Sequence, residues 1–192
     1  MPLGAFFAEA RENPMRRFIV ITAVVGVLGL FVPAAAAQSA YCGSTWGSLP
    51  KVSERLTPTP ITAARAGQHA CFDRFVVEVD RGAPGYRVGY AGAVHTQGSG
   101  DPIPLRGGAF LDVTVLAPAN DANGRVTYAP ANPQEVVPVS GYRTFRQVGW
   151  GGSFEGYTTF GLGVRARLPF RVFTLAGPGS HWRLVVDVAH RW

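Results

Sequence analysis

Hydrophobic and polar side chains alternate along most of the chain from Ile61 onward, and this alternation predicts β-strands. Apolar side chains recur at every second position in six runs: residues 73–80, 86–90, 111–115, 160–164, 169–175 and 182–188. In the first run Phe75, Val77 and Val79 would share one buried face. Each run is short enough to cross a small domain once.

Clusters of glycine, proline, asparagine and aspartate separate these runs, at residues 82–85, 98–102, 120–124 and 177–180. The chain holds 24 glycines and 15 prolines, which suits many tight connections. Beyond the N-terminal region no helical period of useful length appears, apart from one turn expected near Tyr142–Val148. Short strands with frequent turns favour a sandwich or a barrel, and we predict an all-β fold, a β-sandwich of short antiparallel strands.

The N-terminal region has a different pattern. Arg16 and Arg17 precede an uncharged apolar run of 15 residues, 18–32, which Pro33 ends and four alanines, 34–37, follow. This order is typical of a signal peptide, and we expect cleavage after the last alanine. The run is shorter than the ~20 residues that a membrane-spanning helix needs. The sequence therefore predicts a secreted, extracytoplasmic product with no stable membrane anchor after cleavage.

Three segments follow from this: a signal peptide (1–37), an N-terminal linker or strap (38–58) and one domain (59–192). Translation could start at Met1 or at Met15, and the sequence leaves both open. Tyr41 stands directly before Cys42, where a lipid-modified cysteine would need a small residue. A lipoprotein is therefore not expected.

The net charge of the chain adds only a little information about its partner. Beyond residue 37 the chain carries 15 basic and 10 acidic residues, a net charge of +5, and 14 of the 15 are arginine. The planar guanidinium suits carboxylates and phosphates, so an anionic envelope polymer is a fitting partner. A GC-rich genome would also explain the arginine content. Export argues against nucleic acid as the partner.

Cys42 and Cys71 are the two cysteines of the chain. Outside the cytoplasm a single pair most simply forms a disulfide, which would pin the strap to the first strong strand. Two free thiols, or a metal site together with His69, are the alternatives. Neither has further support in the spacing, because no other ligand lies near.

Catalytic patterns are missing from the sequence. The histidines, His69, His95, His181 and His190, do not form a zinc-binding pair such as His-Glu-x-x-His. The stretch 151–156 approaches the Gly-x-Ser-x-Gly elbow, but its closing glycine comes one place late. Asp73 and Asp187 are better explained as partners of arginines than as a catalytic pair. We expect no enzyme, no metal and no cofactor.

Aromatic and basic residues cluster within 16 residues of the chain and give the candidate binding site: Tyr142, Arg143, Arg146, Trp150 and Tyr157. Aromatic rings stack on sugars, and arginine forks bind peptide carboxylates. Packing in the core is the alternative role for Trp150.

Three stretches carry a family resemblance. The first, residues 65–79, contains Asp-Arg-Phe-Val-Val-Glu-Val, and the last, 183–188, reads Arg-Leu-Val-Val-Asp-Val; residues 163–173 lie between them. Together they resemble the AMIN-like domains of secreted bacterial envelope proteins, over roughly residues 59–192. The resemblance implies a two-sheet β-sandwich that binds peptidoglycan or another wall polymer, and it implies no catalytic residues.

The hypothesis from the sequence is therefore a secreted, non-enzymatic module of the cell envelope. Docking to an envelope protein through an exposed sheet edge is the alternative. An uncharacterised hydrolase is a weaker one.

Overall fold

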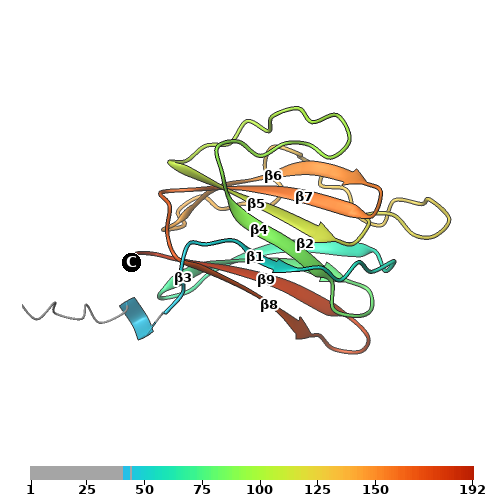
Figure 1. Ribbon diagram of the computed structural model, residues 1–192, viewed down its shortest axis with the longest axis horizontal. Helices are drawn as coiled ribbons and strands as arrows, with labels where there is room; N and C mark the ends of the chain where they lie inside the picture. The colour runs from blue at the N-terminus through green and yellow to red at the C-terminus, as the bar shows by residue number, and fades with distance from the viewer. Residues whose placement is uncertain (1–40, 44) are drawn as a thin grey trace, which may run out of the picture. The chain divides into compact units, whose positions relative to one another are not determined.

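The computed structural model describes residues 41–43 and 45–192. The signal peptide predicted for residues 1–37 and the first residues of the strap, 38–40, lie outside this part of the chain. The described residues form two antiparallel β-sheets that pack face to face (Figure 1). The predicted all-β sandwich is confirmed. Among the described residues no helix is long and apolar enough to span a membrane.

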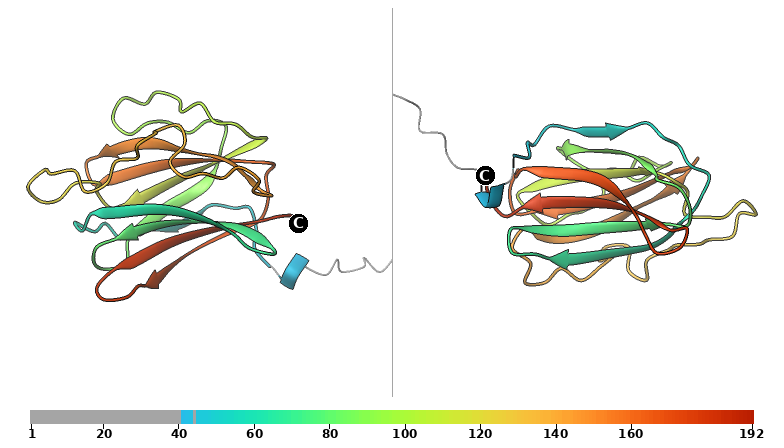
Figure 2. Two further views of the ribbon diagram at one scale, coloured as in Figure 1. Left: turned by 180° about the vertical axis from the view of Figure 1, so that it is seen from behind. Right: turned by 90° about the horizontal axis from the view of Figure 1, so that it is seen from below.

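Nine strands make up the two sheets. The five-stranded sheet has the order β1 (Lys51–Ser53), β4 (Gly85–Ala91), β5 (Ala109–Leu116), β7 (Tyr157–Val164) and β6 (Phe145–Phe154). The four-stranded sheet has the order β2 (Ile61–Gln68), β3 (Phe72–Val79), β9 (Trp182–Ala189) and β8 (Phe170–Ala176). A single 3-10 turn, η1 (Tyr41–Gly43), precedes them. The second view of Figure 2 shows the four-stranded sheet in front of the other layer.

The core lies between the sheets and uses the alternating positions that the sequence indicates. Phe75, Val77 and Val79 of β3 are fully buried. They meet the inner face of the other sheet, where the ring of Phe160 contacts that of Phe75 edge to face at 5.1 Å between centroids. Burial of this apolar area is the main stabilising contribution to the fold.

The helical turn expected near Tyr142–Val148 is wrong. Residues 143–144 form a bend, and the ten-residue strand β6 begins at Phe145. The strand is hard to recognise because Gly149 and Gly151 occupy its outer face. The connection before β5 packs directly on these glycines: a Cβ at Gly149 would lie 3.0 Å from side-chain carbons of Ile103 and Leu105.

The predicted strap closes one open side of the sandwich. The Gly47 carbonyl accepts a hydrogen bond from the Phe170 amide at 3.0 Å, and the strap then pairs with β4 through β1. The predicted disulfide is confirmed, since Cys42 and Cys71 are bonded with 6.1 Å between their Cα atoms. It fixes the start of the strap to the turn between β2 and β3.

Candidate functional site

One end of the sandwich gathers the start of β3, the start of β6, and the ends of β7 and β9. Phe145 pairs with Val164, and the Arg165 amide donates to the Thr144 carbonyl at 2.8 Å. The His190 amide, just after β9, donates to the Cys71 carbonyl at 3.0 Å. The C-terminus and η1 lie at this end too (Figure 1). Segments far apart in sequence therefore share one surface.

Five arginines at this end have no carboxylate oxygen of the described residues within 4.0 Å, and together they define what we call the arginine end: Arg143, Arg146, Arg165, Arg167 and Arg191. Four of the five donate to main-chain carbonyls. Arg146 is the most firmly held, by the carbonyls of Tyr142 at 3.0 Å and Phe145 at 2.9 Å. A carbonyl fixes a guanidinium without neutralising it, so the positive charge stays available.

The remaining four arginines are exposed at the surface. Arg165 donates to the His190 carbonyl, Arg167 to the Ser48 carbonyl at 3.2 Å, and Arg143 to the Ala70 carbonyl at a long 3.4 Å. The guanidinium of Arg191 lies over the Tyr41 ring, 4.6 Å from its centroid. These contacts hold the four guanidinium groups in place, but no carboxylate of the described residues offsets their positive charge.

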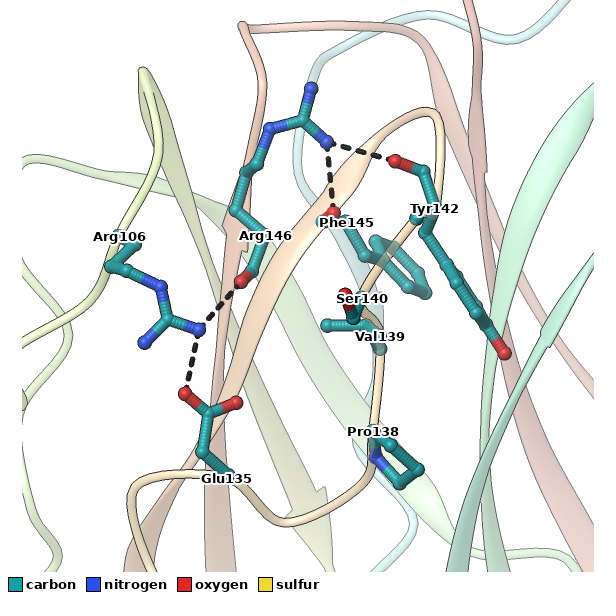
Figure 3. Close-up of a pocket in the computed structure, with 9 residues that line it drawn as sticks. Arg106, Glu135, Pro138, Val139, Ser140, Tyr142, Phe145 and Arg146 are labelled. Carbon is teal, nitrogen blue, oxygen red and sulfur yellow. Dashed lines mark hydrogen bonds and ion pairs between the residues drawn. The ribbon is translucent and has the colours of Figure 1, made fainter.

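An open cavity of about 650 Å³ lies beside Arg146 (Figure 3). Its apolar wall is formed by Pro138, Val139 and the ring of Tyr142. Arg106 also lines it and pairs with Glu135 at 2.6 Å. The cavity thus combines an aromatic ring, an apolar wall and guanidinium groups.

Two buried carboxylates hold this end together. One oxygen of Asp73 accepts the amides of Thr144 at 2.6 Å and Phe145 at 3.0 Å, and the other lies 3.0 Å from His190 Nε2. Asp73 therefore ties β3 of one sheet to the start of β6 in the other. A carboxylate taken out of water needs such partners, because an unpaired buried charge is strongly destabilising.

The second buried carboxylate, Asp187, lies on the outer face of the four-stranded sheet. It accepts from Arg74 at 2.6 and 2.8 Å and from Arg171 at 2.8 Å. Hydrogen bonding to Asp187 raises the pKa of Arg74. These arginines are structural, and neither carboxylate offsets the charge of the five outer ones.

The structure divides the five predicted site residues among three places. Tyr142, Arg143 and Arg146 lie at the arginine end. Trp150 lies four residues beyond Arg146, ~14 Å further along β6, since an extended strand rises ~3.4 Å per residue. Its ring packs edge to face on Phe160, 5.0 Å between centroids, at the border of the core. Tyr157 follows the hairpin turn at the opposite end of β6.

Sequence reasoning missed Arg165, Arg167 and Arg191, because they are distant from residues 142–157 in the chain. The antiparallel pairing of β6 with β7 could have indicated Arg165, since the end of one strand meets the start of the other. No sequence signal pointed to the C-terminal Arg191. The buried His190–Asp73 pair was missed for the same reason.

Within the described ranges no group of three or more His, Cys, Asp or Glu side chains could hold a metal ion. The His190–Asp73 pair is buried, and Asp73 is already occupied by two amides. A substrate would have to displace packed main chain to reach it.

The fold defines a module of two antiparallel sheets packed as a sandwich. The AMIN-like domain family model matches residues 59–190, and the chain belongs to this family. The resemblance of the sequence to AMIN-like domains is thereby confirmed, and it supports an envelope-associated role. No curated protein and no solved structure matches the chain.

Proposed function

We propose that this protein is an exported, non-catalytic module that binds an anionic polymer of the cell wall, peptidoglycan, through its arginine end. The observation that carries the proposal is the set of five arginines that main-chain carbonyls and one aromatic ring hold in place without a carboxylate partner.

Charge without compensation supports an anionic ligand. Each guanidinium keeps donors free for a carboxylate, and a bidentate pair of this kind is stronger than a neutral hydrogen bond. Because the arginines are already positioned, less side-chain entropy is lost when a ligand binds. The peptide stems of peptidoglycan carry carboxylates at repeating intervals, which suits several arginines spread over one end.

The cavity beside Arg146 supports a role for the sugar or the stem peptide. Its volume of about 650 Å³ falls within the range of small-ligand sites. Tyr142 offers a partly exposed ring, already stacked on Phe145 with an interplanar angle of 16°. An aromatic ring in this position can cover an apolar sugar face while the arginines bind charge.

The test is co-sedimentation of the disulfide-bonded protein with purified sacculi over a range of salt concentrations. Arg143 and Arg191 are the best positions to change, because neither makes a short hydrogen bond that the fold needs. The control is Arg55→Gln/Arg125→Gln, which removes the same charge from two exposed arginines outside the arginine end.

We expect the wild type to sediment at low salt and to be released as salt rises, since exposed charges are screened. Arg143→Gln/Arg191→Gln should weaken sedimentation several-fold, while Arg55→Gln/Arg125→Gln should not. Equal losses in both double variants would mean that net charge alone drives binding. A wild type that stays in the supernatant at low salt would overturn the proposal.

A further inference from the structure

The two sheets leave four strands at their edges, and an unprotected edge is a template for another strand. In the five-stranded sheet β1 is three residues long. The other edge, β6, has register shifts at two places, and the connection before it covers its outward backbone: Trp150 donates to the Pro133 carbonyl at 2.7 Å, and Val136 donates to that of Val148 at 2.8 Å. Both edges are thus protected.

The four-stranded sheet has edges β2 and β8, and they differ. The strand β2 has a register shift between Ile61 and Ala63, and the exposed Arg65 stands at its centre. Bulges and charged side chains are common protections of an edge. The strand β8 runs over seven residues in unbroken register with β9 and contains neither proline nor lysine.

The outward backbone of β8 is bound at its two ends, at the Phe170 amide by the strap and at the Ala176 carbonyl by the Arg183 side chain at 2.9 Å. The Phe170 amide points away from β9, because it donates to the Gly47 carbonyl of the strap. Alternate residues of an antiparallel strand point the same way, so the amides and carbonyls of Val172 and Thr174 also face outward. Neither residue has a backbone partner on that side within residues 41–43 and 45–192.

We propose that β8 pairs with β8 of a second copy of this chain, antiparallel and centred on Phe173, so that two four-stranded sheets become one of eight strands. In this register Val172 of each copy exchanges both backbone hydrogen bonds with Thr174 of the other. The strap bond at Phe170 ends the pairing there, which limits the contact to residues 171–175.

Side chains on the outer face favour this register. The two Phe173 rings meet across the axis as a non-hydrogen-bonded pair, the closer of the two arrangements. Arg171 of each copy stands opposite Leu175 of the other, a partly exposed apolar residue. No like charges are opposed, and Arg171 shares the carboxylate of Asp187 with Arg74.

The arrangement of charge also favours a second copy in this orientation. The strand β8 begins near Arg167, at the arginine end, and it runs toward the opposite end of the sandwich. Antiparallel pairing therefore places the two positive ends at opposite tips of the dimer. Repulsion between them is least in this orientation. The dimer itself does not depend on the proposed polymer binding, but it would present two binding ends and could bridge two polymer strands.

Sedimentation velocity of the disulfide-bonded protein over a wide concentration range tests the proposal. We expect a monomer–dimer equilibrium whose dimer fraction rises with concentration. Phe173→Glu places two carboxylates opposite each other and should weaken association on the order of tenfold. Its own fold should tolerate the change, because Arg171 and Arg74 lie 5.0 and 5.6 Å from the Phe173 ring.

Two further variants separate pairing from a general effect of charge. Phe154→Glu puts the same charge in place of an exposed phenylalanine on β6 and should leave the dimer intact. Thr174→Pro removes one outward amide without touching the ladder to β9 and should abolish the dimer. A wild type that stays monomeric at every concentration, or a dimer that Phe173→Glu and Thr174→Pro leave unchanged, would overturn the proposal.

Discussion

The two ends of the sandwich use their arginines differently. At the far end, where β3 ends and β4 begins, Arg81 pairs with Asp80 at 3.2 Å and Arg87 with Glu54 at 2.7 Å. These pairs are exposed to solvent. At the arginine end the exposed guanidinium groups contact carbonyls, and the carboxylates are buried beneath them.

The comparison distinguishes charged groups that stabilise the fold from arginines whose charge no carboxylate offsets. Exposed ion pairs such as Arg87–Glu54 contribute little to stability and are screened by salt. The buried Asp73 connects both sheets through its contacts with the Thr144 amide and His190. Stability and the proposed ligand binding at the arginine end therefore involve different residues, and substitutions can change them separately.

The largest expected effect comes from Asp73. Asp73→Ala leaves the amides of Thr144 and Phe145 without an acceptor and deprives His190 of its partner. We expect the free energy of unfolding to fall by about 3–5 kcal/mol, measured by urea denaturation. Asp80→Ala at the far end removes an exposed carboxylate instead and should cost less than about 1 kcal/mol.

Equal losses for the two aspartate variants would contradict the division between the ends. The slope of the unfolding curve against urea should stay unchanged, so that the shift in midpoint reports stability alone.

The disulfide gives the next largest effect. The bond between Cys42 and Cys71 closes a loop of 29 residues, and chain-entropy arithmetic gives about 3–4 kcal/mol for a loop of this length. Replacing both cysteines by serine should lower the free energy of unfolding by this amount. The strap carries no comparable cross-link at the far end, where the hydrogen bond from Thr57 to Leu116 fixes it.

Limited proteolysis shows which part of the strap is released when the disulfide is absent. Without the disulfide, residues near Trp46 should become accessible to protease before those near Thr57, because the strap keeps its pairing with β4. Cleavage that starts near Thr57 would argue against the disulfide as the local anchor.

Much of the fold could be predicted from the sequence because the strands obey one simple rule. In β3, β5, β7 and β9 apolar residues recur at the core-facing positions, and the alternation is visible in the residues themselves. The strand β6 does not obey it, since its outer face is covered by another segment and carries glycines. The glycines on the outer face of β6 remove the alternation of apolar and polar residues, so this strand resembles a loop in sequence.

The candidate site was harder to predict, because closeness in sequence was taken for closeness in space. Residues 142–157 lie along a strand and its turn, so Tyr142 and Tyr157 are at opposite ends. Arg165 and Arg191 join Arg143 only through the pairing of strands and the packing of the C-terminus. The register of β6 with β7 brings these arginines together, and the amino-acid composition carries no information about that register.

The smallest expected effect concerns two half-buried tyrosines with different electrostatic surroundings. Burial alone raises the pKa of Tyr128, to about 12. Burial also raises the pKa of Tyr90, but there a hydrogen bond with the Leu168 backbone and the nearby Arg167 act in the opposite direction. The guanidinium of Arg167 lies 5.0 Å from the Tyr90 ring, at the arginine end.

Titration of the Tyr90 and Tyr128 phenols measures the distance over which the positive charge of the arginine end acts. Native Tyr128 keeps its proton to about pH 12, whereas an unfolded tyrosine releases it near ~10. Between these values the native state binds more protons, so the contribution of Tyr128 to stability is complete below pH ~10 and is lost as the pH rises through its native pKa.

Arg167→Gln should raise the pKa of Tyr90 further and leave that of Tyr128 unchanged, as measured by NMR of the ring carbons. If both phenols shift together, the charge of the arginine end acts on the whole domain rather than locally. If neither shifts, Arg167 is screened by solvent, and its charge would contribute little to a ligand held at the same distance.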